Sequence, residues 1–199
     1  MFFNANIMSP KPYIVGISGG KKNGHTSQFL SLALEEANNL GANAKLFELS
    51  DYNIKTISQT TNNPEHDESL EFSDDMHIIA QELLSADGII FASPVHWFGV
   101  SSEMKILIDR LTPFENKGFL LESKVCGFIV YGNEEGRVFA LTQMAAMANH
   151  MGMIVPPYAM LYLTNQESDW ASKDILLLPK NMIKIINCVK QNSLTFGYE

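Results

Sequence analysis

The chain has 199 residues, 46% of them hydrophobic and 18% charged, and this composition excludes an intrinsically disordered chain and a coiled coil. Asp and Glu number 22 against 14 Lys and Arg, and the net charge of −8 argues against nucleic acid or a membrane as a partner, because both attract positive surfaces. No apolar run is long enough to span a bilayer and the first residues lack the basic start of a signal peptide, so we expect a cytoplasmic protein. The expected organisation is a single domain over residues 1–199, with an N-terminal extension at 1–12 and a C-terminal tail at 192–199.

The first part of the chain alternates short apolar runs with helical patterns. The runs Tyr13–Ile17 and Ala44–Leu49 are typical of strands. Asn53–Ser73 is polar and irregular, and we expect it to be the longest loop. Two sets of apolar residues recur at i, i+3, i+4 and i+7, the spacing of one helix face: Leu30, Ala33, Leu34 and Ala37, and then Met76, Ile79, Ala80 and Leu83.

Three further buried strands are predicted in the second part of the chain, at Gly88–Ala92, Lys124–Val130 and Met153–Pro156. A helix lies between the first two of them, and Ser101 or Ser102 is placed to cap its start. The apolar face of this helix is formed by Met104, Leu107, Ile108 and Leu111.

Two more helices complete the predicted elements. The first ends at Gly152, which suits the left-handed position after a helix, and the second begins at Pro179, which suits the first helical position. Five strands that alternate with five helices predict an α/β domain whose parallel sheet is covered on both faces. Ligands of such sheets bind at the carboxyl ends of the strands, so the loops after strands one, three and four are candidate sites. The apolar faces of the two helices are Leu141, Met144, Ala145 and Ala148, and Met182, Ile185, Ile186 and Val189.

The loop after the first strand reads SGGKKNGHTS and begins at Ser18. It combines glycines, hydroxyls and lysines with the N-terminus of a helix, where free N–H groups and the helix dipole favour an anion. Because Ser18, Thr26 and Ser27 add hydroxyl donors, we predict a phosphate site here. An ordinary connecting loop, with a turn at Asn23-Gly24 and an N-cap at Thr26 or Ser27, is the alternative.

Other motifs overlap this loop in part. A dinucleotide-binding GxGxxG is absent, and a Walker A pattern has His25 in place of its lysine, which weakens an NTPase interpretation. Gly16–Gly20 matches the G-x-S-x-G nucleophile elbow, and Ser18, Asp109 and His150 follow the chain order of a serine hydrolase. The glycines after Ser18 delay the helix that an elbow requires, so a serine hydrolase using Ser18 is kept as an alternative.

The loops after the third and fourth strands suit a planar ring. Ser93–Val100 contains three consecutive ring side chains, His96, Trp97 and Phe98, which either form a platform for a flat ligand or pack into the protein or a dimer interface. Tyr131–Gly136 can offer backbone donors and acceptors to a ring edge, and a solvated turn is its alternative. A phosphate cradle, an aromatic loop and a glycine-bearing loop at one sheet edge fit a ligand with a phosphate tail and a heteroaromatic head, and FMN is such a ligand.

Two segments resemble the flavodoxin-like NAD(P)H-dependent FMN reductase family, which includes the iron–sulfur flavoproteins. GISGGKKNGHTSQFL is similar to the phosphate loop of that family, and ADGIIFASPVHWFGVSSEMKILIDRLTPF is similar to a long segment of it. The resemblance covers the chain from Tyr13 to Gly152 and implies a three-layer sandwich with a five-stranded parallel sheet in the order 2-1-3-4-5. Asp109-Arg110 corresponds to a D-R pair of the family, which an ion pair or a helix-end contact explains equally well.

The resemblance also implies a reaction and a cofactor site. Hydride from NADH or NADPH would pass to FMN, and electrons would then pass to a small-molecule acceptor such as a flavin or a quinone, with no catalytic side chain required. A non-catalytic FMN-binding electron carrier is the alternative. A homodimer or homotetramer is expected, because a second subunit usually walls the site in this family. Cofactor contacts are expected from Ser18, Gly20, Asn23, His25, Thr26, Ser27, Pro94, Val95, His96, Trp97, Phe98, Tyr131, Gly132, Asn133 and Gly136.

Iron–sulfur members of the family carry a cysteine cluster in the loop after the second strand, and this chain departs from them there. The segment LSDYNIKTISQTTNNPEH contains no cysteine, and the two cysteines of the chain are Cys126 and Cys188. Because such clusters are bound by thiolates, we expect no iron–sulfur cluster. The five histidines show no spacing of metal ligands, so no metal site is expected.

Overall fold

A parallel sheet of five strands forms the centre of the structure, a computed structural model that describes residues 10–60, 69–133, 135–165 and 169–197. The order of these strands is β2-β1-β3-β5-β6, which confirms the predicted 2-1-3-4-5 when they are numbered along the chain. A short additional strand, β4 (Gly99–Val100), pairs antiparallel with β3. The strands of the main sheet are β1 (Tyr13–Ser18), β2 (Asn43–Glu48), β3 (Gly88–His96), β5 (Val125–Tyr131) and β6 (Met160–Leu163).

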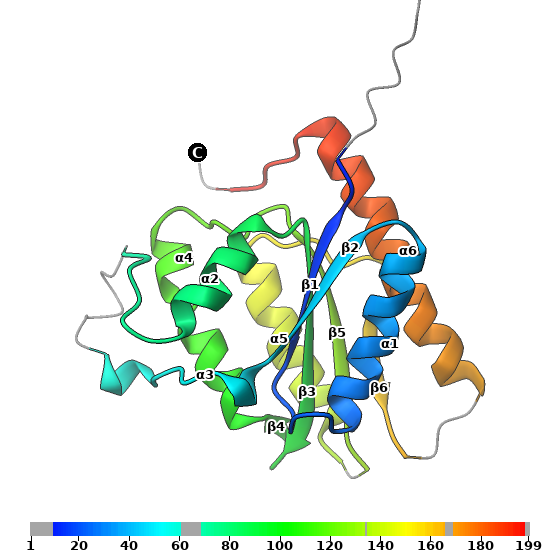
Figure 1. The fold of residues 1–199 in the computed structure, drawn as a ribbon, viewed down its shortest axis with the longest axis horizontal. Helices are drawn as coiled ribbons and strands as arrows, with labels where there is room; N and C mark the ends of the chain where they lie inside the picture. The colour runs from blue at the N-terminus through cyan, green and yellow to red at the C-terminus, as the bar shows by residue number, and fades with distance from the viewer. Residues whose placement is uncertain (1–9, 61–68, 134, 166–168, 198–199) are drawn as a thin grey trace, which may run out of the picture.

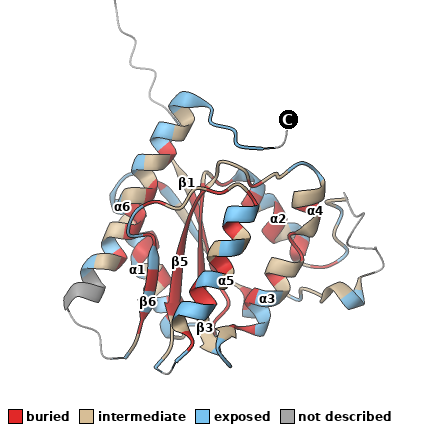
Figure 2. Cartoon of the chain, turned by 180° about the vertical axis from the view of Figure 1, so that it is seen from behind, coloured by how far each residue is buried: buried red, intermediate tan, exposed pale blue. Residues whose placement is uncertain are grey.

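Helices cover both faces of the sheet (Figure 1), and the central strands β1, β3 and β5 are buried between them (Figure 2). On one face, Ile14 and Ile90 pack with the inner residues of α1 and α6. On the other face, the adjacent strand residues Val15 and Ile89 pack with α2, α3, α4 and α5. Because alternate residues of β1, β3 and β5 are buried on opposite faces, these central strands are continuous apolar runs in the sequence. The helices are α1 (His25–Asn39), α2 (Met76–Ser85), α3 (Ser102–Asp109), α4 (Thr112–Asn116), α5 (Arg137–His150) and α6 (Asp169–Asn192).

Two predicted helix ends are confirmed. Ser101 caps α3, because its Oγ accepts a hydrogen bond from Met104 N–H at 3.2 Å. Gly152 follows α5 with a φ of +70°, and the N–H of the next residue, Met153, donates a hydrogen bond to Ala148 O at 2.9 Å. A left-handed glycine therefore ends this helix, as its sequence indicates.

The predicted fifth strand at Met153–Pro156 is wrong. Ile154 makes an isolated bridge with Val125, and Pro156 and Pro157 cannot donate hydrogen bonds to a ladder. The strand forms later in the chain, at β6, where Met160 to Leu163 pair with Phe128 to Tyr131 of β5. The turn around the prolines carries the chain to this position.

The predicted start of the last helix at Pro179 is also wrong. Pro179 lies inside α6, which begins at Asp169. A proline in a helix removes one backbone hydrogen bond, yet the neighbouring residues Leu178 and Met182 are buried against the sheet. Packing against the sheet therefore stabilises the helix on both sides of Pro179, although a proline more often marks a helix start.

The two ends of the described chain lie near the amino ends of the strands. Beyond α6, Phe196 N–H donates to Glu122 Oε1 at 2.5 Å, and Ser123 Oγ donates to Leu194 O. Most of the expected N-terminal extension, residues 1–9, lies outside the described residues. The C-terminal segment therefore packs away from the edge where the candidate loops are found.

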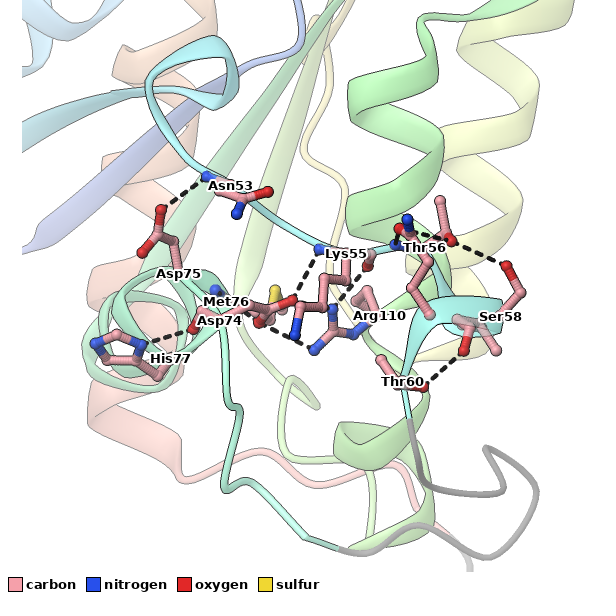
Figure 3. Close-up of polar contacts among 12 residues, drawn as sticks. Asn53, Lys55, Thr56, Ser58, Thr60, Asp74, Asp75, Met76, His77 and Arg110 are labelled. Carbon is pink, nitrogen blue, oxygen red and sulfur yellow. Dashed lines mark hydrogen bonds and ion pairs between the residues drawn. The ribbon is translucent and has the colours of Figure 1, made fainter.

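A buried ion pair anchors the long loop predicted at Asn53–Ser73, of which residues 61–68 lie outside the described residues (Figure 3). Arg110 Nη1 lies 2.6 Å from Asp74 Oδ2, and it also donates to Lys55 O at 2.7 Å. Burial by itself would raise the pKa of Asp74, but the hydrogen bonds from Arg110 and the backbone hold that pKa below its usual value. Of the two explanations for Arg110, an ion pair or a helix-end contact, the ion pair is therefore formed. It connects the first part of the loop to the C-terminal end of α3.

Candidate functional site

The loop between β1 and α1 is held tightly against the sheet. Gly19 N–H donates to Ala92 O at 2.8 Å, and a Cβ at Gly19 would lie 2.6 Å from Ser101 Oγ, so only glycine fits there. Helix α1 begins after Gly24, which is its N-cap. The N-cap expected at Thr26 or Ser27 is therefore wrong, whereas the ordinary connecting loop of which it was part stays an alternative.

The hydroxyls of Ser18 and Ser27 are buried and join the two ends of this loop. Their Oγ atoms lie 2.8 Å apart, within hydrogen-bond distance. Ser18 Oγ also accepts from Gly20 N–H at 3.3 Å, and Ser27 Oγ is 3.4 Å from Lys21 O. Both hydroxyls thus have partners inside the loop, which is shaped before any ligand arrives.

The start of α1 offers free backbone donors. The first hydrogen bond of the helix runs from Gln28 N–H to Gly24 O at 2.9 Å, so the N–H groups of residues 25–27 precede it and have no acceptor inside the helix. A Cβ at Gly20 would lie 3.0 Å from the Cβ of the buried Thr26, so glycine keeps the space beside these donors open. Together with the helix dipole, the donors make this loop suited to an anion.

Strand β3 continues past its predicted end at Ala92 to His96, where the chain turns back into β4. His96 pairs with Gly99, which leaves Trp97 and Phe98 as a two-residue turn. Both have positive φ, 47° and 65°, as the centre of a type I′ turn requires and as aromatic residues seldom adopt. Trp97 is 96% exposed and Phe98 is 57% exposed. The two rings therefore remain open on this chain rather than packing into its core.

A cavity of about 880 Å³ lies between this hairpin and the loop after β5. Its volume is in the range of small-molecule sites, roughly 300–1,000 Å³. Glu135, which the sequence patterns did not single out, belongs to its lining. The other lining residues were all expected to contact the cofactor: Pro94, Val95, His96, Trp97, Phe98, Tyr131, Gly132 and Asn133.

The two walls of the cavity pack on each other through glycines. A Cβ at Gly132 would lie 3.0 Å from Val95 Cγ2, and a Cβ at Gly136 would lie 2.7 Å from Phe98 Cα. Gly136 also has a φ of +104°, which side-chain-bearing residues rarely adopt. Gly136, which was expected to contact the cofactor, therefore packs against the hairpin at Phe98 and is not among the residues that line the cavity.

Hydrogen bonds fix the loop after β5 from two sides. Arg137 Nη1 donates to Gly132 O at 2.9 Å, Asn165 N–H donates to Asn133 Oδ1 at 2.9 Å, and Tyr131 Oη donates to Asn165 Oδ1. The sequence patterns missed both anchoring residues. Arg137 follows the glycine-bearing loop directly, whereas Asn165 follows β6, a strand that was expected elsewhere, and no local signal marks it.

A ring contact connects the phosphate loop with the cavity. The rings of His25, the first residue of α1, and Tyr131, the last of β5, have centroids 5.0 Å apart at an interplanar angle of 33°. Phe29 lies on the same tyrosine at 5.7 Å. The side chain of His25 therefore contacts Tyr131, which lines the cavity. The three loops that were expected to meet do converge at one edge of the sheet.

The residues of the serine hydrolase alternative are not brought together. Ser18 Oγ is bonded to Ser27, while His150 Nε2 lies 2.8 Å from Glu115 Oε1. His150 ends α5, whose start is at the site, so it lies about 20 Å further along the helix axis. The triad does not form, and this alternative is wrong.

Neither cysteine belongs to this site. Cys126 is buried in β5, and burial raises the pKa of its thiol to about 12; Cys188 is exposed on α6. Within the described ranges, no three or more His, Cys, Asp or Glu side chains gather as metal ligands. A membrane-spanning helix is not found among the described helices, since none combines the necessary length with an apolar sequence.

Comparisons with known proteins agree with this architecture. The family described as NADPH-dependent FMN reductase matches residues 12–168. An iron–sulfur flavoprotein of Methanocaldococcus jannaschii is 32% identical over 120 residues, which are 60% of this chain and 61% of that protein. An iron–sulfur flavoprotein of Archaeoglobus fulgidus is 32% identical over 117 residues, which are 58% of this chain and 52% of that protein. The chain thus spans between 52% and 61% of the length of these relatives.

The fold is shared with solved structures of low sequence identity. A WrbA-like flavodoxin of Agrobacterium tumefaciens has a TM-score of 0.62 at 18% identity, over 92% of this chain and 99% of that one. The family match extends from the residue before β1 to beyond β6 and includes all three loops of the site. The chain, with its flavodoxin-like fold, therefore belongs to the NADPH-dependent FMN reductase family.

Proposed function

We propose that this chain is an NAD(P)H-dependent oxidoreductase that binds FMN at the carboxyl edge of its sheet. The observation that carries the proposal is the meeting of an anion-binding loop with an open cavity, joined where the ring of His25 lies on Tyr131. Family membership supports FMN as the ligand that has both a phosphate and a flat ring.

The residues present fit FMN at both ends. The phosphate would be held by the backbone N–H groups of residues 25–27, in the space that Gly20 leaves open. The ring system would lie between the Trp97-Phe98 turn and Tyr131–Asn133, where backbone groups can bond its polar edge. Because the whole chain carries a charge of −8, a phosphate must be held by such local donors rather than by long-range attraction.

The proposed role of the protein is to position and shield the cofactor. Bound FMN would supply the redox chemistry, taking hydride from NADH or NADPH and passing electrons to a small-molecule acceptor such as a flavin or a quinone. Val95, Trp97 and Phe98 would present apolar surface at the ring and reduce its contact with water. Hydride transfer needs no general acid or base, so we assign no catalytic side chain.

We further propose that a second copy of the chain covers the aromatic end of the site, in a homodimer or homotetramer. Trp97 and Phe98 at the turn, and Val138 and Phe139 in the first turn of α5, are all more than half exposed. Contiguous apolar surface of this kind marks interaction sites on soluble proteins. Light scattering of the purified protein tests this, and a monomer at micromolar concentration would contradict it.

We also propose that no iron–sulfur cluster is present, although the relatives compared here are named as iron–sulfur flavoproteins. Cluster irons are held mainly by thiolates, and the donor set of this chain, Cys126 in the core and Cys188 on α6, does not fit one. Assays of iron and acid-labile sulfide in protein purified without oxygen test this point. Stoichiometric amounts of both would contradict it.

The experiment that tests the function is an anaerobic visible spectrum of the protein with FMN, before and after NADPH and then NADH. We expect a bound-flavin spectrum that bleaches with at least one of the nucleotides, which would also identify the donor. Bound flavin that neither nucleotide bleaches would replace the reductase with an electron carrier. Failure to bind flavin would contradict the proposed site.

A further inference from the structure

The acidic end of β2 meets the tip of the phosphate loop. Glu48, the last residue of β2, accepts a hydrogen bond from Asn23 N–H through Oε1 at 2.8 Å. Three residues later, Asp51 binds Lys22 Nζ, at 2.7 Å from Oδ2 and 3.0 Å from Oδ1. Two donors of an anion-binding loop are thus engaged by carboxylates of the protein.

The contact with Glu48 fixes an unusual backbone conformation. Asn23 has a φ of +55°, in the left-handed region, and its carbonyl accepts from Gln28 Nε2 at 3.0 Å. The tip is therefore held on its N–H side by β2 and on its carbonyl side by α1. Asn tolerates this conformation better than most residues, and the two bonds favour it further.

The same contact places a negative charge beside the proposed phosphate site. Asn23 lies two residues before the first of the free N–H groups of α1, so a carboxylate bound to it is at most about 13 Å from an anion held there. Like charges at this distance repel, although water and salt weaken the repulsion. The carboxylate therefore orders the loop while opposing the ligand that the loop is suited to bind.

We propose that Glu48 is a positioning residue of the phosphate loop, which holds Asn23 in place while its charge limits the affinity for FMN. This inference rests on the proposed function, because it needs FMN as the ligand. It predicts that the two effects of Glu48 can be separated. Glu48→Gln keeps an oxygen acceptor and removes the charge, whereas Glu48→Ala removes both.

Glu35 provides a matched control for the change of charge. It lines the same groove as Glu48, between α1 and β2, and it is exposed. Among the contacts of the described residues, no hydrogen bond joins it to the phosphate loop. Glu35→Gln therefore changes the net charge as Glu48→Gln does and leaves the loop anchored.

The test is titration of flavin-free protein with FMN and, separately, with riboflavin, which lacks the phosphate, followed by quenching of flavin fluorescence. We expect Glu48→Gln to bind FMN about fivefold more tightly than the unaltered protein, since a repulsion is removed. Glu48→Ala should bind FMN about tenfold more weakly than Glu48→Gln, since a hydrogen bond to the loop is lost. Riboflavin affinity should be the same in all four proteins, and Glu35→Gln should bind FMN like the unaltered protein.

The outcomes distinguish this inference from the proposed function. Equal FMN affinities of the two Glu48 variants, or equal changes for FMN and riboflavin, would overturn the positioning role and leave the reductase proposal standing. If Glu35→Gln increases the affinity for FMN as much as Glu48→Gln does, the effect comes from net charge, and the positioning role of Glu48 is overturned as well. If the unaltered protein binds no FMN, both proposals fail. Circular dichroism and melting temperature confirm that each variant is folded.

Discussion

The carboxyl edge of the sheet is built differently on its two sides. On one side, hydrogen bonds and ion pairs hold the segments, and the deepest of them is the buried Asp74–Arg110 pair. On the other side, hydrogen bonds hold the loop after β5, glycine contacts join this loop to the hairpin, and Trp97 and Phe98 are left exposed at the turn. We call the first side the polar half, residues 18–27, 48–60 and 69–75 together with Arg110, and the second the aromatic half, residues 94–99 and 131–136.

This difference indicates a division of tasks. Side chains of the polar half form hydrogen bonds within one chain, as Ser18–Ser27 and Glu48–Asn23 show, so its shape is set before a ligand binds, while the N–H groups of residues 25–27 are left for a ligand. The aromatic half keeps two rings open in a backbone conformation that aromatic residues seldom adopt, which is a common property of functional sites. We infer that the polar half supplies the anchor and the aromatic half the surface at which substrates and a second copy meet.

Arg110→Met should disturb the polar half most. Asp74 would keep a buried charge without its partner, and such a loss typically lowers the free energy of unfolding by about 3–5 kcal/mol. Urea unfolding followed by circular dichroism measures this. Lys105→Met is the control on the same helix, because it removes the exposed Lys105–Asp109 pair and should change stability by less than about 1 kcal/mol. If the two variants lose equal free energy of unfolding, burial of the Asp74–Arg110 pair does not increase its contribution to stability.

Thr26→Glu should release the cofactor without touching the aromatic half. Thr26 is buried in the first turn of α1, so a longer acidic side chain would place negative charge at the proposed phosphate site. We expect FMN affinity to fall at least about 100-fold, equivalent to about 2.7 kcal/mol. Flavin absorbance of the purified protein measures it. Thr26→Val keeps the shape and the backbone N–H and should lose less than about tenfold, and full flavin content in Thr26→Glu would contradict the placement of the phosphate.

Trp97→Gly should stabilise the aromatic half of the isolated chain. The indole is almost wholly exposed and contributes little packing, whereas a left-handed conformation at a residue with a Cβ costs about 1 kcal/mol. Trp97→Ala retains the Cβ and hence the strain, so the glycine variant should unfold at a higher temperature than the alanine variant. Thermal unfolding of dilute, flavin-free protein makes the comparison. A more stable alanine variant would show that the turn is not strained.

Acid should weaken the polar half through Asp74. Because its pKa is held below the usual value, the ionised carboxylate stabilises the fold fully above about pH 3.9, the ordinary pKa of an Asp, and this stability is lost as pH falls through the lower folded-state pKa. Between about pH 5 and about pH 2, the unaltered protein should therefore lose more stability than Asp74→Asn, which has no carboxyl group to protonate there. Urea midpoints at the two pH values test this. Parallel losses would assign acid sensitivity to other groups.

Local sequence patterns were sufficient for most of the fold. The strands β1, β2, β3 and β5 and the apolar faces of α1, α2, α3, α5 and α6 follow from periodicity, because burial on both faces of a parallel sheet leaves a clear pattern, whereas the short elements β4 and α4 were not predicted. The last strand was misplaced, since β6 has four residues and alternates between exposed and buried positions as an edge strand does. The full length of α6 was missed because Pro179, a common helix start, lies within it.

The contacts that anchor the site lay beyond such patterns. Glycines, hydroxyls and aromatic residues identified the three loops, since each has a local role in the turn it forms. The partners that hold them are distant in the sequence: Asp74 and Arg110 are 36 residues apart, and Tyr131 and Asn165 are 34 apart. Which distant residues meet depends on how the helices pack on the sheet, and neither composition nor spacing records that.

The glycine contacts of the hairpin have a mechanical consequence for the cavity. Gly132 packs tightly on the side chain of Val95, and Gly136 packs on the backbone of Phe98 with no room for a methyl group. The hairpin therefore cannot move closer to the start of α5, and these contacts set how near the two walls of the cavity can approach each other. A methyl group added at Gly136 would push the backbone of Phe98 away, so Gly136→Ala should move the Trp97-Phe98 turn relative to the loop after β5.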